Sequence, residues 1–108
     1  IVIASGVVTT LAGSSSGNTN ATGTSASFNY PIGITTDGTN IYVADTHNHR
    51  IRKIVIASGV VTTLAGSSQG STNATGTLAS FHFPVGITTD GTDLYVIDTN
   101  NHRIRKID

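Results

Sequence analysis

Short runs of alternating apolar and polar residues recur along the chain, and each run is bounded by residues that form turns. Residues 31–36 alternate apolar with small or polar side chains, and residues 40–45 are rich in β-branched and aromatic side chains. Both patterns are typical of β-strands, in which successive side chains point to opposite faces. Asp37-Gly38 lies between the two runs and suits a tight hairpin turn, because Gly adopts positive φ without strain.

Two further runs complete a unit of four strands. Residues 45–48, Asp-Thr-His-Asn, predict a turn, since Asp and Asn side chains bond backbone amides close by in the chain. Residues 49–57 predict a third strand, Ser58-Gly59 a second turn, and residues 60–65 a fourth strand. No segment predicts a helix. Four strands joined by short turns make an antiparallel meander.

Two long polar stretches connect such units. Residues 14–27 and 67–80 consist almost wholly of Ser, Gly, Thr, Asn and Ala. With few large apolar side chains, they gain little from burial to offset the entropy of ordering. We therefore expect two surface loops, each joining the last strand of one unit to the first strand of the next.

The whole pattern occurs twice. Aligning residues 1–53 with 54–106 leaves ten differences, at positions 16, 18, 25, 29, 30, 32, 40, 41, 44 and 47 of the first copy. A period of this size is the signature of repeat architectures, in which one unit cannot bury its apolar face alone. A repeated four-stranded meander describes the blade of a β-propeller, which has about four to eight blades. We predict an all-β fold with two four-stranded antiparallel blades.

Three segments of the repeat carry a resemblance to a known family. They are Pro31-Ile-Gly-Ile-Thr-Thr-Asp-Gly38, Asn40-Ile-Tyr-Val-Ala-Asp-Thr-His-Asn-His-Arg-Ile-Arg-Lys-Ile54 and Val61-Thr-Thr-Leu-Ala-Gly66, with counterparts at residues 84–91, 94–107 and 8–13. Together they resemble the NHL repeat, and the Asp-Thr-x-Asn-His-Arg-Ile-Arg segment is fairly specific. The resemblance implies a propeller, most often one of six blades.

The ends of the chain do not coincide with the ends of its blades. Only residues 28–66 contain four strands in succession and make one contiguous blade. Residues 81–108 supply the first three strands of a second blade, and residues 1–13 match the end of a third strand and a fourth strand. Two blades cannot close a ring, so we expect residues 1–13 to complete the second blade of another copy, head to tail. A homotrimer would have six blades and a homotetramer eight, and the resemblance favours three copies.

Composition fits a globular protein outside the membrane. The chain is 37% apolar and has a formal net charge of zero. No apolar run approaches the roughly 20 residues that span a bilayer, so we expect a soluble protein with no membrane partner. Cys is absent, which excludes disulfides and thiolate metal sites. The composition points to no particular compartment.

The basic residues form the strongest candidate for a binding surface. All six lie in two copies of Arg-Ile-Arg-Lys, as Arg50, Arg52, Lys53, Arg103, Arg105 and Lys106. Stacked blades would gather them into a ring that attracts phosphates, and the resemblance implies that some relatives bind RNA or protein on a basic face. His49 and His102 precede the two clusters and could join this surface or bind a metal. The alternative is that the Arg side chains pair with Asp and cover apolar surface, and that each His bonds a neighbouring blade or faces solvent. Sparse aromatic residues and zero net charge favour the alternative, so nucleic acid is not an expected partner.

No combination of residues predicts catalysis. The chain has no Gly-x-Ser-x-Gly elbow and no pair of carboxylates with recognisable glycosidase spacing. We expect no enzyme, no cofactor and no bound metal, since near-identical blades lack the asymmetry of a single active site. The favoured function is a self-assembling structural unit, engineered or excised from a repetitive propeller, whose partners are other copies of the chain. The alternative is a binding module that holds a protein, glycan or RNA through the propeller face or the long loops.

Overall fold

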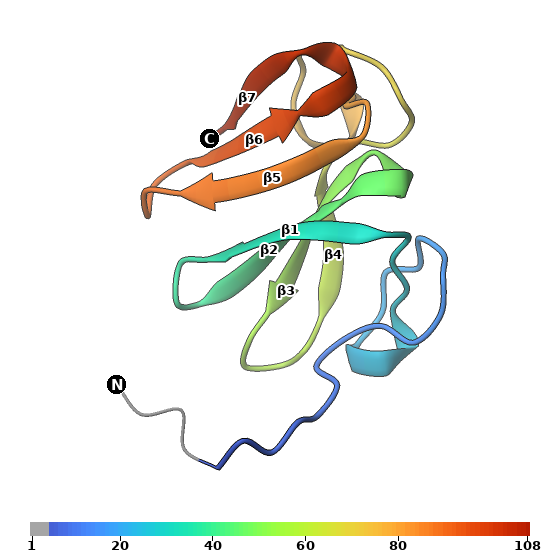
Figure 1. The fold of residues 1–108 in the computed structure, drawn as a ribbon, viewed down its shortest axis with the longest axis vertical. Helices are drawn as coiled ribbons and strands as arrows, with labels where there is room; N and C mark the ends of the chain where they lie inside the picture. Colours follow the sequence, from blue (N-terminus) through green and yellow to red (C-terminus); the bar gives the residue numbers. More distant parts are fainter. Residues whose placement is uncertain (1–4) are drawn as a thin grey trace.

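Seven strands form two antiparallel sheets in the computed structural model, which describes residues 5–108 (Figure 1). The first sheet contains β1 (Pro31–Thr36), β2 (Asn40–Asp45), β3 (Arg50–Val55) and β4 (Val61–Ala65), and the second contains β5 (Pro84–Thr89), β6 (Leu94–Asp98) and β7 (Arg103–Ile107). Neighbours in each sheet are also neighbours in sequence, so both sheets are meanders. The all-β prediction is confirmed, with four strands in one sheet and three in the other.

The strand boundaries differ from the predicted ones only beside two turns. β1 and β2 have the predicted limits, whereas the third strand is Arg50–Val55 instead of 49–57. It begins late because His49 has the left-handed φ of 55° that ends a 3₁₀ turn. It ends early because the Gly59 amide donates a hydrogen bond to the Val55 carbonyl at 2.7 Å and closes the next turn.

The polar loops are more ordered than their composition predicts. Each contains a three-residue 3₁₀ helix, Gly23–Ser25 or Gly76–Leu78, and no α-helix occurs in residues 5–108. Ala26 in the first loop is completely buried. The Ala21 carbonyl accepts a hydrogen bond from the Val61 amide at 2.8 Å, so this loop lies along the outer side of β4. Small side chains let backbone groups approach closely, and hydrogen bonds supply the cohesion that apolar burial does not.

The main core lies between the two sheets, where the apolar faces of adjacent blades meet. Its buried members are Ala44, Ile51 and Ala65 of the first sheet with Phe81 and Val96 beside and within the second. β1 and β5 lie side by side in this contact (Figure 1).

The two sheets approach each other closely at Gly33 of β1. A Cβ atom there would overlap the carbonyl oxygen of Val85, so only glycine allows this approach. The sheets therefore pack face to face along their first strands.

A second core covers the other face of the first sheet. It contains Val43, Ile54 and Val61, with Phe28 and Ala12 packed against them. Ala12 belongs to the N-terminal segment, which makes no regular strand in the described chain and extends beyond the first sheet (Figure 1). One end of that segment is thus fixed to the blade while the rest projects from it.

Candidate functional site

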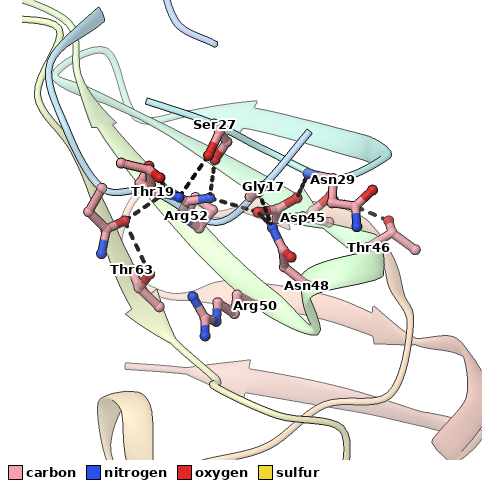
Figure 2. Close-up of polar contacts among 12 residues, drawn as sticks. Gly17, Thr19, Ser27, Asn29, Asp45, Thr46, Asn48, Arg50, Arg52 and Thr63 are labelled. Carbon is pink, nitrogen blue, oxygen red and sulfur yellow. Dashed lines mark hydrogen bonds and ion pairs between the residues drawn. The ribbon is translucent and has the colours of Figure 1, made fainter. Parts of the chain in front are cut away.

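A buried ion pair holds the first long loop on the first blade (Figure 2). Arg52 of β3 and Asp45 at the end of β2 lie 2.7 Å apart, Nη1 to Oδ2, and both side chains are 0% exposed. The guanidinium also donates to the carbonyl oxygens of Ser27 at 2.8 Å and Thr19 at 2.9 Å, and to Oδ1 of Asn20 at 2.8 Å. A charge removed from water needs such partners, and here they are supplied by the loop.

The carboxylate of the pair organises the turn between β2 and β3. Asp45 Oδ1 accepts the Asn29 amide hydrogen at 2.8 Å, and Oδ2 accepts a hydrogen bond from Asn48 Nδ2 at 2.8 Å. The same Asn48 nitrogen donates to the Gly17 carbonyl at 2.7 Å, which ties the turn to the long loop. The predicted turn role of Asp and Asn is therefore present, together with long-range contacts.

The second blade repeats this arrangement. Arg105 Nη1 lies 2.7 Å from Asp98 Oδ2 and donates to the Ser80 carbonyl at 2.9 Å. The other guanidinium nitrogen donates to the Thr72 carbonyl at 3.0 Å and to Asn73 Oδ1 at 2.8 Å. Both blades thus fix the adjoining loop by one mechanism.

Arg52 and Arg105 follow the alternative favoured from the sequence, in which Arg pairs with Asp, and they do not form an exposed basic surface. Both are buried, because their charges are neutralised by Asp and their N–H groups are used by the loops. Lys53 lies on the opposite face of β3 from Arg52, since successive strand residues alternate. The Arg-Ile-Arg-Lys segments therefore do not present their charges together.

The remaining predicted residues are dispersed. Arg50 donates through Nε to the Ser67 carbonyl at 3.1 Å, while Arg103 and His102 are exposed. Lys106 lies 3.5 Å from Asp108 and 3.8 Å from Asp93, whose negative charges raise the pKa of Lys106. His49 is half-buried between the blades. Within residues 5–108, no group of three or more His, Cys, Asp or Glu side chains could hold a metal ion.

The most distinctive feature is an open edge on the second sheet, and the phase of the repeats, not the charged residues, points to it. In the first blade β4 covers β3, pairing Ala65 with Ile51 and Val61 with Ile54. In the part of the chain that the structure describes, β7 has no such neighbour. A groove of ≈ 760 Å³ lies instead between β7 and residues 73–76, and we call it the strand groove.

The N-terminal segment has the sequence that fills this position in the first blade. Residues 8–12, Val-Thr-Thr-Leu-Ala, are identical to β4. Val8 is 92% exposed, whereas its counterpart Val61 is 1% exposed. Gly6 has a φ of 75°, the same value as its counterpart Gly59 just before β4.

The end of the segment is anchored as the end of β4 is. The Gly13 amide donates to the Gly23 carbonyl at 3.2 Å, and in the second repeat the Gly66 amide donates to the Gly76 carbonyl at 3.1 Å. Ala12 packs on the core of the first blade. The segment therefore occupies the place that the fourth strand of a preceding blade would take.

Two apolar blade faces are also uncovered. Ile32 and Ile34 on the first blade are 60% and 65% exposed beside a groove of ≈ 320 Å³. Ile97 and Ile104 on the second blade are 52% and 69% exposed, although their counterparts in the first blade belong to the completely buried core. Exposed apolar surface of this kind is typical of interaction sites.

Consecutive antiparallel meanders that pack face to face, with their first strands together, define the blades of a β-propeller. The NHL repeat model matches residues 28–54 and 81–107, half of the chain, and the chain belongs to the NHL repeat family. The resemblance inferred from the sequence is confirmed. No helix in residues 5–108 is long and apolar enough to cross a membrane.

Relatives share the repeats within much longer proteins. NHL repeat-containing protein 2 is 37% identical in Homo sapiens over 98 residues and 43% identical in Gallus gallus over 99 residues. Each match covers 85% of this chain but only 14% of the relative. Among solved structures, an auxiliary nutrient binding protein from Bacteroides ovatus has a TM-score of 0.76 at 26% identity, covering 91% of this chain and 28% of that one.

Proposed function

We propose that this chain is a self-assembling propeller unit, in which residues 8–12 of one copy complete the second blade of another. The observation that carries the proposal is one sequence in two environments: buried as β4 and exposed as residues 8–12. An unpaired sheet edge beside a groove is a template for strand addition. In a longer polypeptide, neighbouring repeats would supply the same strand.

The first blade gives the expected register. Because β3 pairs Ile51 with Ala65 and Ile54 with Val61, the added strand would place Ala12 beside Ile104 and Val8 beside Ile107. On its outer side, the Val8 amide would donate to the Ala74 carbonyl, as the Val61 amide donates to the Ala21 carbonyl. The strand groove is bounded by these two partners, β7 and the loop.

Strand addition also brings the uncovered faces together. Ile97 and Ile104 of one copy would face Ile32 and Ile34 of the next, and apolar burial would stabilise the contact. The two surfaces differ, so the association is heterologous and closes when its rotation divides a full turn. A homotrimer with six blades is the favoured product and a homotetramer with eight is the alternative. The near-identical repeats support an engineered or excised origin from a repetitive propeller and give no support to a catalytic role.

A binding module is the second candidate. The buried Arg52 and Arg105 networks fix both long loops and would present them as rigid surfaces for a protein, glycan or RNA. A structural neighbour is named as a nutrient binding protein, which supports a binding role. Retention of glycans or proteins by the assembled chain, lost after changes in residues 67–80, would favour this candidate.

Light scattering of the purified chain after size-exclusion chromatography tests assembly. Three copies of the 11.1 kDa chain give about 33 kDa, and four give about 44 kDa. A folded species of 11.1 kDa at all concentrations up to the millimolar range would contradict self-assembly.

A further inference from the structure

Five aromatic rings gather where the first and second blades meet beside the long loops, and we call this place the ring cluster. It comprises Tyr30, His47, His49, His82 and Phe83. Neighbouring ring centroids are 4.4 Å apart for Tyr30 and His47, 4.7 Å for His49 and Phe83, and 5.6 Å for His49 and His82. Three of the five rings are imidazoles, which can change charge near neutral pH.

His49 makes a hydrogen bond across the two blades. The backbone amide of Phe83, just before β5, donates to His49 Nδ1 at 3.1 Å. An imidazole nitrogen accepts a hydrogen bond only when it carries no proton, so this His49 is neutral with its proton on Nε2. Protonation at Nδ1 would place two hydrogens against each other and break the contact.

We infer that this contact is a pH-sensitive device that holds the two blades together at the loop-bearing end and releases them there when His49 is protonated. The groups that face His49 are two further histidines, His82 and His47, and one carboxylate, Asp98. Asp98 is completely buried and paired with Arg105, so its charge is already compensated. A charged His49 would therefore gain little attraction and would repel any neighbouring imidazolium.

The sign of the pH effect follows from the direction of the pKa shift. Burial, then the nearby His82 and His47, hold the pKa of His49 below its ordinary value of 6.5, while Asp98 acts in the opposite direction. A lowered pKa in the folded chain means that the unfolded chain binds the proton first. The stabilisation is thus complete above pH 6.5 and is lost as pH falls through the folded pKa.

The duplication shows that the cluster is specific to this one contact. The counterparts of His82 and His47 in the other repeat are Asn29 and Asn100, which do not titrate. His102, the counterpart of His49, is exposed in the described chain. Because the ring cluster lies within one chain, the inference does not depend on assembly.

NMR of the intact chain between pH 7.5 and 5 tests the device through two local signals. The His49 imidazole should titrate with a midpoint below pH 6.5. The protection factor of the Phe83 amide against hydrogen exchange should fall as His49 becomes protonated. The expected fall is roughly fivefold, the equivalent of one hydrogen bond of average net strength. A midpoint at or above 6.5, or constant protection of Phe83, would overturn the inference.

Matched variants identify the group responsible. His49→Asn keeps a side-chain acceptor and tolerates the left-handed φ of 55°, so Phe83 protection should become independent of pH. His102→Asn is the same change in the other repeat and should leave the pH dependence intact. His82→Asn should move the His49 midpoint upward. If His49→Asn retains the parent's pH dependence, or His102→Asn abolishes it, the assignment to His49 is wrong.

Discussion

Val8 distinguishes the single chain from the proposed assembly, because its side chain is exposed in the first and would be buried in the second. It is 92% exposed in the chain, whereas Val61 at the same position of a complete blade is 1% exposed. Val8→Asp therefore changes a solvent-facing side chain before assembly and an interior side chain after it. The substitution should leave the fold of the chain intact and prevent strand addition.

The magnitude follows from burial. Full burial of a Val side chain contributes about 1.5–3 kcal/mol, so nearly all of this is lost with the two methyl groups. Placing an Asp without a partner in the same position costs about 2 kcal/mol more at the least. Together these give about 4 kcal/mol for each contact between copies, or about a thousandfold in Kd.

Val7→Asp is the matched control. Val7 is 78% exposed and its counterpart Val60 stays 37% exposed in the complete blade, so the same charge one residue away should change assembly little. Light scattering at several concentrations gives the masses, and circular dichroism verifies that both variants keep the β signal. An unchanged mass for Val8→Asp, or equal loss of assembly in both variants, would refute strand addition in this register.

Three further substitutions or titrations test the single chain. Arg52→Ala leaves a buried carboxylate without its cation, so urea denaturation should show a free energy of unfolding lower by about 3–5 kcal/mol; a change below about 1 kcal/mol would show that the pair is dispensable. Gly33→Ala should lower the melting temperature because its new methyl group overlaps a carbonyl oxygen of β5, whereas at Gly86 the nearest atom to a new methyl group is the terminal Cδ1 of Ile97, which can shift; equal shifts in melting temperature would contradict this distinction. Hydrogen bonds from backbone amides, that of Asn40 foremost, lower the pKa of Asp37, so NMR should give a carboxyl midpoint below 3.8, and the turn's stabilisation should be present above pH 3.8 and lost as pH falls through that midpoint.

Local patterns were sufficient to predict the strands. Residues 31–36 and 40–45 were predicted at their observed limits, because β-branched residues alternate between turns that Gly and Asn form. The third strand was predicted too long at both ends, because its composition shows neither the left-handed backbone of His49 nor the hydrogen bond from the Gly59 amide to the Val55 carbonyl. His102 has the same left-handed φ, 56°, and ends the same 3₁₀ turn, so the left-handed backbone belongs to the turn itself.

The sequence indicated that Arg52 pairs with Asp, but it did not indicate which loop groups the guanidinium also binds. Arg52 lies among charged residues that suggest a surface, yet its partners include the carbonyls of Ser27 and Thr19, 25 and 33 residues earlier. The available signal was the repeated spacing of Asp45 and Arg52, seven residues apart, with one at the end of a strand and the other inside the next. In the register of β2 and β3, Arg52 lies opposite Val43 and Asp45 lies opposite Arg50, so Asp45 and Arg52 lie two positions apart on one face of the sheet.

The ten differences between the repeats bear on how copies would join. None falls in residues 8–12, 19–24 or 50–54, which correspond to the added strand, the loop beside it and the strand that receives it. Five of the ten, at positions 29, 30, 32, 44 and 47, lie at or beside the contact between blades. A strand from another copy would therefore find in β7 the same partner that β4 finds in β3.

The contacts between blades would, by contrast, be of two kinds. The one within the chain contains Ala44 and His82, and the proposed one between copies would contain Ile97 and Asn29. Complementary surfaces that differ in this way favour one order of blades around a ring, because swapping them would bring together unlike volumes. Val8→Asp should then affect only the contact between copies and His49→Asn only the contact within a chain. If either substitution altered both contacts, the two would not be independent, and the alternation of blades around the ring would lose its support.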